Sequence, residues 1–158
     1  MKRIIIVGPA ASGKDFLKSR LEKRGYTLDI SYTTRPIRKD EEQGREYHFL
    51  TEKEFMDEST QFYEYVKFGD YYYGTGEIEW ETCDVFIMEA SAVKALTEKE
   101  RKKCLVIYLN PPKDVRFERL WTNGRGWEHV KITKRFETDD KLFKDFTDYD
   151  IQITNPDF

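Results

Sequence analysis

The sequence predicts an α/β fold in which a parallel five-stranded sheet is covered by helices on both of its faces. Short, nearly continuous apolar runs alternate along the chain with stretches of helical spacing. This alternation is typical of parallel strands that are buried on both faces. A glycine-rich loop joins the first run to the first helix, and 158 residues suffice for one compact domain with small insertions.

The apolar runs give the strands, and the periodic stretches give the helices. Gly25 is expected to end the first helix, and Pro111-Pro112 to begin the third. The expected strands are residues 4–7, 26–30, 85–88, 105–109 and 151–154. The expected helices are residues 14–24, 91–103, 113–121 and 130–146.

Residues 31–80 break this alternation, and we expect them to form an inserted lobe. Thr51 and Glu54 have the spacing of a capping box, which predicts one short helix. Residues 61–68 and 71–73 are rich in aromatic strand formers and are separated by a Gly-Asp turn, so they predict a hairpin.

A second insertion, at about residues 122–134, is expected to form a small lid. It contains Arg125 between two glycines, a composition that suits a mobile segment carrying a cation. Residues 1–30 and 81–158 would then make up the core of a single domain.

The composition argues against several functional classes. The formal charge of −3 and the pI near 5.6 argue against broad electrostatic binding of nucleic acid. No segment is long and apolar enough for a membrane span and no leader precedes the first strand, so we expect a soluble, cytoplasmic protein with no membrane partner. Cys83 and Cys104 lie beside apolar runs and read as reduced thiols, while His48 and His129 are isolated. No residue signature indicates an oligomeric state.

A phosphate-binding loop, Gly8-Pro9-Ala10-Ala11-Ser12-Gly13-Lys14, directly follows the first strand. Glycines let the backbone curve around an anion, and the following helix adds partial positive charge from its N-terminus. Lys14 is placed to neutralise the β- and γ-phosphates of a nucleoside triphosphate. The residues expected to contact that nucleotide are Gly8, Ala10, Ala11, Ser12, Gly13, Lys14, Asp15 and Phe16.

Asp15 stands where most such loops have a Ser or Thr that binds Mg²⁺. Its carboxylate can hold the metal directly or through water, but it also stands near phosphate charge that repels it. Two outcomes follow: an active site that holds its metal differently, or a site that only binds.

The lobe carries the most specific motifs of the chain. Ser31-Tyr32-Thr33-Thr34-Arg35-Pro36-Ile37-Arg38 is followed by Gly44-Arg45-Glu46-Tyr47-His48-Phe49, by Glu64 and by Tyr72-Tyr73-Gly74-Thr75. In order and spacing, these segments resemble the guanylate kinase family, and the resemblance runs from Gly8 to about Phe146. Because the chain stops just after its last expected strand and has the loop ending Gly-Lys-Asp, it resembles a short, phage-like member.

The resemblance implies a P-loop kinase fold with an acceptor-binding lobe. It implies that Arg35, Arg38, Tyr47 and Tyr73 grip the monophosphate of the acceptor, and that Ser31, Glu64 and Thr75 read its base. Guanidinium forks and phenolic hydroxyls suit a phosphate dianion. One carboxylate can accept both N–H groups on the N1 and N2 edge of guanine, whereas adenine presents a bare acceptor there.

For catalysis, the resemblance implies that Arg125 and Arg135 close over the transferring phosphoryl group with Lys14, and that ATP and Mg²⁺ are required. Positioning and cationic charge suffice because the acceptor phosphate is already a nucleophile. The family usually has Asp-x-Asp where this chain has Ile87 and Glu89, so Glu89 is the acid left for the acceptor site.

We therefore expect phosphoryl transfer from ATP to GMP or dGMP. One alternative is a kinase for another phosphorylated small molecule, such as ribose 1,5-bisphosphate or another nucleoside monophosphate. Another is an inactive relative that binds phosphorylated ligands or peptides. Glu64, Tyr73 and Thr75 favour a guanine base, whereas Lys14 and Arg125 argue against a pure binding module.

Overall fold

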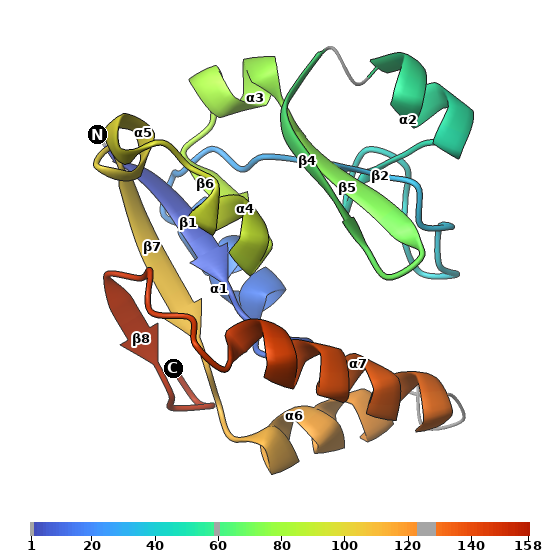
Figure 1. Cartoon of the computed structure of the whole chain (residues 1–158), viewed down its shortest axis with the longest axis vertical. Helices are drawn as coiled ribbons and strands as arrows, with labels where there is room; N and C mark the ends of the chain where they lie inside the picture. The colour runs from blue at the N-terminus through green and yellow to red at the C-terminus, as the bar shows by residue number, and fades with distance from the viewer. Residues whose placement is uncertain (1, 59–60, 123–128) are drawn as a thin grey trace.

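The computed structural model describes residues 2–58, 61–122 and 129–158 and shows an α/β core that carries a smaller lobe (Figure 1). The core sheet is parallel and has the strand order β6-β1-β7-β8. Ile5 of β1 pairs with Phe86 on one side and Val106 on the other, so β1 lies inside the sheet. The bounds are β1 Arg3–Val7, β6 Val85–Ile87, β7 Cys104–Leu109 and β8 Ile151–Ile153.

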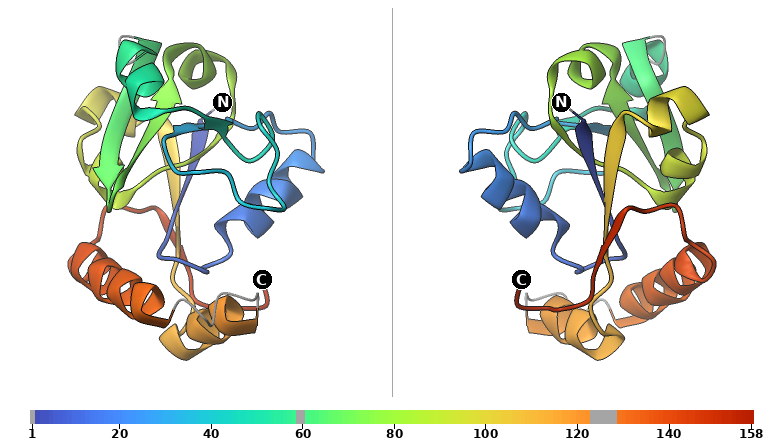
Figure 2. Two further views of the ribbon diagram at one scale, coloured as in Figure 1. Left: turned by 90° about the vertical axis from the view of Figure 1, so that its right-hand side faces the viewer. Right: turned by 90° about the vertical axis from the view of Figure 1, so that its left-hand side faces the viewer.

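The apolar character of β1 follows from packing on both faces of the sheet. Ile5 and Val7 belong to one buried cluster, while Ile4 and Ile6 belong to another. Successive side chains of a strand point to opposite faces, so a run without polar residues needs cover on both sides. Figure 2 shows this cover, with α1 on one side of the sheet and α7 on the other.

The helices of the core alternate with its strands along the chain. The helix α1 begins directly after the glycine loop, and its leucines pack on the cluster that contains Ile4. The bounds are α1 Lys14–Glu22, α3 Glu77–Thr82, α4 Ala90–Lys94, α5 Glu98–Arg101, α6 Lys113–Leu120 and α7 His129–Phe143. Among the described residues, none of these helices is long and apolar enough to cross a membrane.

The lobe has a second sheet, with the order β3-β2-β5-β4, and the helix α2. The expected hairpin is confirmed, and Gly69 in its turn has a φ of 61°, which favours glycine. Phe55 of α2 is fully buried against Phe62, with ring centroids 4.5 Å apart. The bounds are β2 Tyr32–Thr33, β3 His48–Phe49, α2 Glu52–Glu58, β4 Phe62–Phe68 and β5 Tyr71–Gly76.

The strand expected at residues 26–30, the second along the chain, is reduced to a single parallel bridge between Leu28 and Val85. The side chain of Asp84 accepts hydrogen bonds from the amide and hydroxyl of Thr27, at 2.8 and 2.7 Å. Backbone hydrogen bonds also hold the segment at the sheet edge: the carbonyl oxygen of Thr27 accepts from the amides of Asp84 and Val85, at 2.9 and 3.1 Å, and that of Val85 accepts from the amide of Asp29 at 2.9 Å. The described core sheet therefore has four strands and one bridge.

The expected helix at residues 91–103 is divided into α4 and α5. Thr97 causes the division because it caps a new helix, its hydroxyl accepting a hydrogen bond from the amide of Glu100 at 3.2 Å. The helical spacing of apolar residues continues across Thr97, so this spacing alone did not predict the division into two helices.

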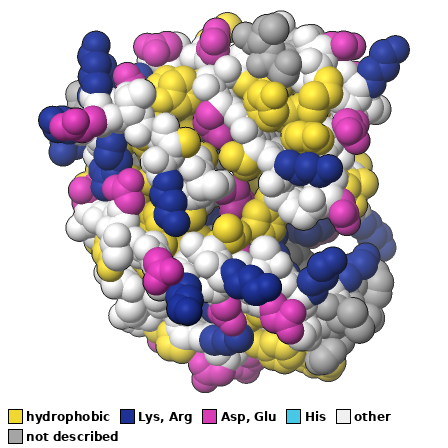
Figure 3. Space-filling view, in the orientation of Figure 1, with side chains coloured by type: hydrophobic (Ala, Val, Ile, Leu, Met, Phe, Trp, Pro, Cys, Tyr) yellow, Lys and Arg dark blue, Asp and Glu magenta, His cyan; other side chains and the backbone are white. Residues whose placement is uncertain are grey.

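The surface is hollowed between the tip of the β4–β5 hairpin and α7 (Figure 3). Lys and Arg side chains lie on both sides of this hollow. The core and the lobe therefore meet at a place where an anionic ligand would be attracted.

Candidate active site

The phosphate-binding loop has the backbone of an anion cradle. Gly13 caps α1 with a φ of 97°, and Ala11 has a φ of 59°. Residues with positive φ beside a helix N-terminus turn successive N–H groups to the inside of a loop. Lys14 folds across this loop, donating to the carbonyl oxygens of Gly8 at 2.6 Å and Pro9 at 3.0 Å.

Gly8 is required by close packing. A Cβ added at this position would lie 2.5 Å from the Oγ of Ser12 and 2.7 Å from the carbonyl oxygen of Leu109. Ser12 is buried, and its Oγ has no hydrogen-bond partner among the described residues. A buried hydroxyl without a partner is available to donate a hydrogen bond to an oxygen of a ligand.

A pocket lies beside the cradle, between the start of α1, the end of α6 and the C-terminal segment. Arg119 borders it and donates to the carbonyl oxygens of Ala11 at 3.0 Å and Pro156 at 2.8 Å. Phe16 is 56% exposed there, and its ring lies 5.7 Å from that of Phe158. The pocket is lined by Ala11, Ser12, Gly13, Lys14, Asp15, Phe16, Arg119, Leu120, Pro156, Asp157 and Phe158.

A second pocket, which we call the acceptor pocket, lies between the lobe and the ends of the core strands. It contains most of the residues that the sequence predicted for the acceptor. Asp15 borders both this pocket and the one beside the cradle. The acceptor pocket is lined by Asp15, Lys18, Ser31, Glu46, Tyr47, Glu64, Val66, Tyr73, Gly74, Thr75, Ile87, Met88 and Glu89.

Glu64 stands in this pocket as a partly satisfied carboxylate. Its Oε1 accepts a hydrogen bond from the hydroxyl of Thr75 at 3.0 Å, while its buried Oε2 has no partner among the described residues. Burial raises the pKa of Glu64 to about 7, although the bond from Thr75 opposes the shift. An open oxygen in a buried carboxylate fits a ligand that presents N–H groups.

Tyr47 and Tyr73 form an aromatic wall of the pocket, with ring centroids 6.0 Å apart. The guanidinium of Arg35 lies 5.4 Å from the centroid of the Tyr47 ring. Burial raises the pKa of both phenols, so they stay protonated and can donate to phosphate oxygens.

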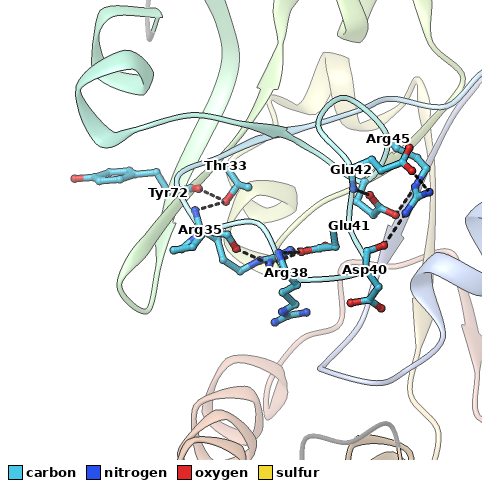
Figure 4. Close-up of polar contacts among 10 residues, drawn as sticks. Thr33, Arg35, Arg38, Asp40, Glu41, Glu42, Arg45 and Tyr72 are labelled. Carbon is cyan, nitrogen blue, oxygen red and sulfur yellow. Dashed lines mark hydrogen bonds and ion pairs between the residues drawn. The ribbon is translucent and has the colours of Figure 1, made fainter.

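Arg35 is engaged by a carboxylate from its own loop. Its Nη1 and Nη2 donate to the two carboxylate oxygens of Glu41, each at 2.8 Å (Figure 4). The hydrogen bonds from Arg35 lower the pKa of Glu41. Arg38 is exposed, does not border the acceptor pocket, and points away from this pair.

Lys14 and Glu89 face the same interior. Burial lowers the pKa of Lys14, and the negative charge of Glu89 opposes that shift. Burial likewise raises the pKa of Glu89, against the positive charges of Lys14 and Arg135. The three charged groups therefore lie within electrostatic reach of one another; Lys14 lines the pocket beside the cradle, and Glu89 lines the acceptor pocket.

Lys18 and Asp29 belong to the surroundings of this pocket, although the sequence reasoning did not single them out. The Nζ of Lys18 donates to the carbonyl oxygen of Asp29 at 2.5 Å. Asp29 is fully buried and accepts a hydrogen bond from the hydroxyl of Ser31 at 2.6 Å. The usable signal was the position of Lys18 one helical turn after Lys14, which places both side chains on one face.

Three further residues were missed: Glu41, Arg119 and Asp139. Glu41 and Arg119 contact predicted site residues, as described above. Asp139 is buried and lies one helical turn after Arg135. The spacing of Arg135 and Asp139 was readable as an ion pair on one helix face, but nothing in the sequence indicated that this face is buried.

The predicted lid residue Arg125 lies outside the described residues. Among the residues that the structure describes, no group of three or more His, Cys, Asp or Glu side chains is arranged to hold a metal ion.

The chain is similar to known proteins of one family. The family model described as guanylate kinase matches residues 1–158. The guanylate kinase of Buchnera aphidicola subsp. Acyrthosiphon pisum (strain APS) is 32% identical over 166 residues, covering 98% of this chain and 80% of that protein. The guanylate kinase of Aster yellows witches'-broom phytoplasma (strain AYWB) is 32% identical over 165 residues, covering 96% of this chain and 77% of that protein.

A solved structure supports the fold. The crystal structure of guanylate kinase from Anaplasma phagocytophilum matches with a TM-score of 0.69 and 17% identity, covering 98% of this chain and 76% of that one. With a family match over its whole length and relatives above 30% identity, the chain belongs to the guanylate kinase family.

Proposed function

We propose that this protein transfers the γ-phosphoryl group of ATP to GMP or dGMP, forming ADP and GDP or dGDP. The observation that carries the proposal is that the two pockets share Asp15 and meet beside Lys14. Two nucleotides bound in these adjacent pockets would have their phosphates close together. This arrangement suits direct transfer of a phosphoryl group from one to the other.

The acceptor base is read by Glu64 with Thr75 and Ser31. The open Oε2 of Glu64 accepts from the N1 and N2 edge of guanine, while Thr75 holds the other oxygen. Adenine has no donor at N1 and would leave this buried oxygen unpaired, a mismatch that sites of this kind reject by a factor of roughly 10⁴ or more.

The acceptor phosphate is held by Arg35, Arg38, Tyr47 and Tyr73, and Arg38, which does not border the pocket in this structure, would have to turn toward it. The phenols line the pocket, and Arg35 is pre-set beside them by Glu41. Glu89 lines the same pocket, and its negative charge raises the pKa of Lys14 against the effect of burial. Because Arg35 is already fixed in a fork, little conformational freedom is lost when phosphate binds.

On the donor side, the loop amides and Lys14 hold the ATP phosphates, with Arg135 and Arg125 as further cations. The contacting residues are Gly8, Ala10, Ala11, Ser12, Gly13, Lys14, Asp15 and Phe16. Asp15 would hold Mg²⁺ directly or through water, and Mg²⁺ would neutralise charge on the β- and γ-phosphates. Lys14, now bonded to carbonyls of its own loop, would exchange those contacts for phosphate oxygens.

This reaction assigns a role to each part of the chain. Residues 1–30 and 81–158 would form the core, residues 31–80 the acceptor lobe, and residues from about 122 to 134 the lid. The expected cytoplasmic location stays a prediction.

The test is ADP production from ATP and Mg²⁺ with GMP, dGMP, AMP, CMP, UMP, dTMP or ribose 1,5-bisphosphate as the acceptor. We expect turnover with the guanine nucleotides. Turnover with the bisphosphate alone would assign a different acceptor. Binding of GMP or a phosphopeptide without turnover would instead indicate the inactive binding module.

A further inference from the structure

Arg135 is held on two sides by residues outside the phosphate-binding loop. Its Nε donates to both carboxylate oxygens of Asp139, at 3.2 and 3.3 Å. Its guanidinium lies over the ring of Phe68, with 4.1 Å between the Cζ atom and the ring centroid. Phe68 ends strand β4 of the lobe, so the contact joins the lid-side helix α7 to the lobe.

Asp139 in turn joins α7 to the phosphate-binding loop. It is 2% exposed, and its Oδ2 accepts a hydrogen bond from the backbone amide of Ala10 at 2.9 Å. A buried carboxylate needs partners of this kind, because an unpaired charge in the interior is costly. One side chain thus fixes both a cation and the loop that the cation must face.

We propose that Asp139 is a positioning residue for phosphoryl transfer, which fixes Arg135 through Nε and leaves its two terminal amino groups for the transferring phosphoryl group. This inference rests on the proposed function. It adds a residue that neither the sequence motifs nor the comparisons assign.

The geometry of the guanidinium supports this role. An arginine presents its donors in a planar fork, and both contacts with Asp139 fall on Nε. Among the described residues, the side chain of Arg135 makes no hydrogen bond through Nη1 or Nη2. With Nε held by Asp139 and one face covered by Phe68, the terminal donors remain for an anion.

The positive charge of Arg135 acts on residues of both pockets. Burial lowers the pKa of Lys14, and the positive charge of Arg135 lowers it further. Burial raises the pKa of Tyr73, which Arg135 opposes. Arg135 therefore stands within electrostatic reach of the loop lysine and of the acceptor wall, where a cation stabilises charge on the phosphoryl group.

Preorganisation explains why a carboxylate would be useful beside this arginine. A free arginine must be ordered during each turnover, whereas an arginine already held in place requires no rearrangement at that step. Displacing a catalytic group by about 1 Å can lower the rate about 100-fold. We therefore expect Asp139→Ala to lower the rate of transfer about tenfold or more.

A double-mutant cycle tests the proposal. The full-length wild type, Asp139→Ala, Arg135→Ala and the double variant are compared by kcat, KM and single-turnover rate with ATP, Mg²⁺ and GMP. A second cycle uses Asp139→Asn, which keeps the shape of the side chain. The matched control is Asp140→Asn, because Asp140 is the next residue of α7 and pairs on the surface with Lys113 at 2.6 Å.

If Asp139 acts through Arg135, Asp139→Ala lowers kcat in the wild-type background, changes each KM less than about threefold, and has little further effect when Arg135 is already Ala. A coupling above about threefold in either cycle supports the proposal. Equal losses in both backgrounds would overturn it, since Asp139 would then act through the loop or through stability. Failure of the wild type to transfer phosphate would instead refute the proposed function and this inference with it.

Discussion

Glu64 has a buried carboxylate oxygen that we expect to bind guanine. One of its oxygens is satisfied by Thr75, whereas the other is buried without a partner among the described residues. Burial raises its pKa to about 7, so near neutral pH the empty pocket holds a mixture of the ionised and protonated forms. Guanine selects the ionised form because both of its edge groups are donors.

This predicts pH-dependent binding of GMP. Since the ionised carboxylate binds and the pKa is about 7, the contribution of Glu64 to affinity is present above pH 7 and is lost as the pH falls. Between pH 8 and pH 6 we expect a loss of roughly tenfold from this group. Calorimetry with wild type and Glu64→Gln measures it, since the phosphate of GMP contributes equally to both.

The Gln variant should bind GMP more weakly at pH 8 and show less change between the two pH values. The ratio of GMP to AMP turnover should also fall. If both proteins showed the same pH dependence and the same ratio, Glu64 would not be the residue that reads the base.

Several residues that the sequence motifs singled out are brought together by the fold, whereas Arg35 and Arg38 do not line the acceptor pocket. Ser31, Tyr47, Glu64, Tyr73 and Thr75 were each expected at the acceptor and all line one pocket. Lys18, Asp29 and Asp139 were missed because their places depend on tertiary packing: each is an ordinary charged residue until the fold buries it or turns it toward the site.

At the scale of single elements, the helix α2 shows how local chemistry fixes a boundary. The Oγ1 of Thr51 accepts from the amide of Glu54, and the carboxylate of Glu54 accepts from the amide of Thr51, each at 3.1 Å. This confirms the predicted capping box. The helix places Phe55 in the lobe core, where it is fully buried.

Replacing Thr51 with Ala should therefore lower the free energy of unfolding by about 1 kcal/mol, because an amide of the first turn loses its acceptor. Urea denaturation measures the change, with Lys53→Ala, an exposed position of the same helix, as the control. A loss no larger than that of the control would show that the cap contributes nothing to stability.

Element boundaries were less predictable where two signals competed. Helical spacing continued through residues 91–103, yet Thr97 starts a new helix inside that stretch. The segment at residues 26–30 has the apolar residues of a strand, yet it makes one bridge with β6, and both the backbone and the side chain of Asp84 contact Thr27 there. At residues 91–103, a side-chain hydrogen bond to the backbone outweighed the periodic pattern.

At the scale of the whole molecule, one buried carboxylate, Asp29, makes the stability of the fold depend on pH. Asp29 is fully buried, and burial raises its pKa from 3.8 to about 6, against the opposing bond from Ser31. The folded protein thus binds this proton more tightly than the unfolded chain does. Its contribution to stability falls as the pH rises from about 4 to about 6 and stays low above that range.

Asp29→Asn removes this ionisation and should stabilise the protein at pH 7, by at most about 3 kcal/mol for a shift of this size. At pH 4, where wild-type Asp29 is protonated in the fold, the two proteins should differ little. Urea denaturation at both pH values tests this. Equal effects of the substitution at pH 4 and pH 7 would show that ionisation of Asp29 does not govern stability.

The central claim is that the two pockets exchange a phosphoryl group, and ATP labelled in its γ-phosphate tests it most directly. With GMP and Mg²⁺, we predict that the label appears in GDP, and that Lys14→Ala abolishes this transfer while leaving GMP binding nearly intact. Lys23→Ala, an exposed lysine just after α1, should behave as wild type. Label that remains in ATP or appears only as inorganic phosphate, while GMP binds normally, would contradict the account.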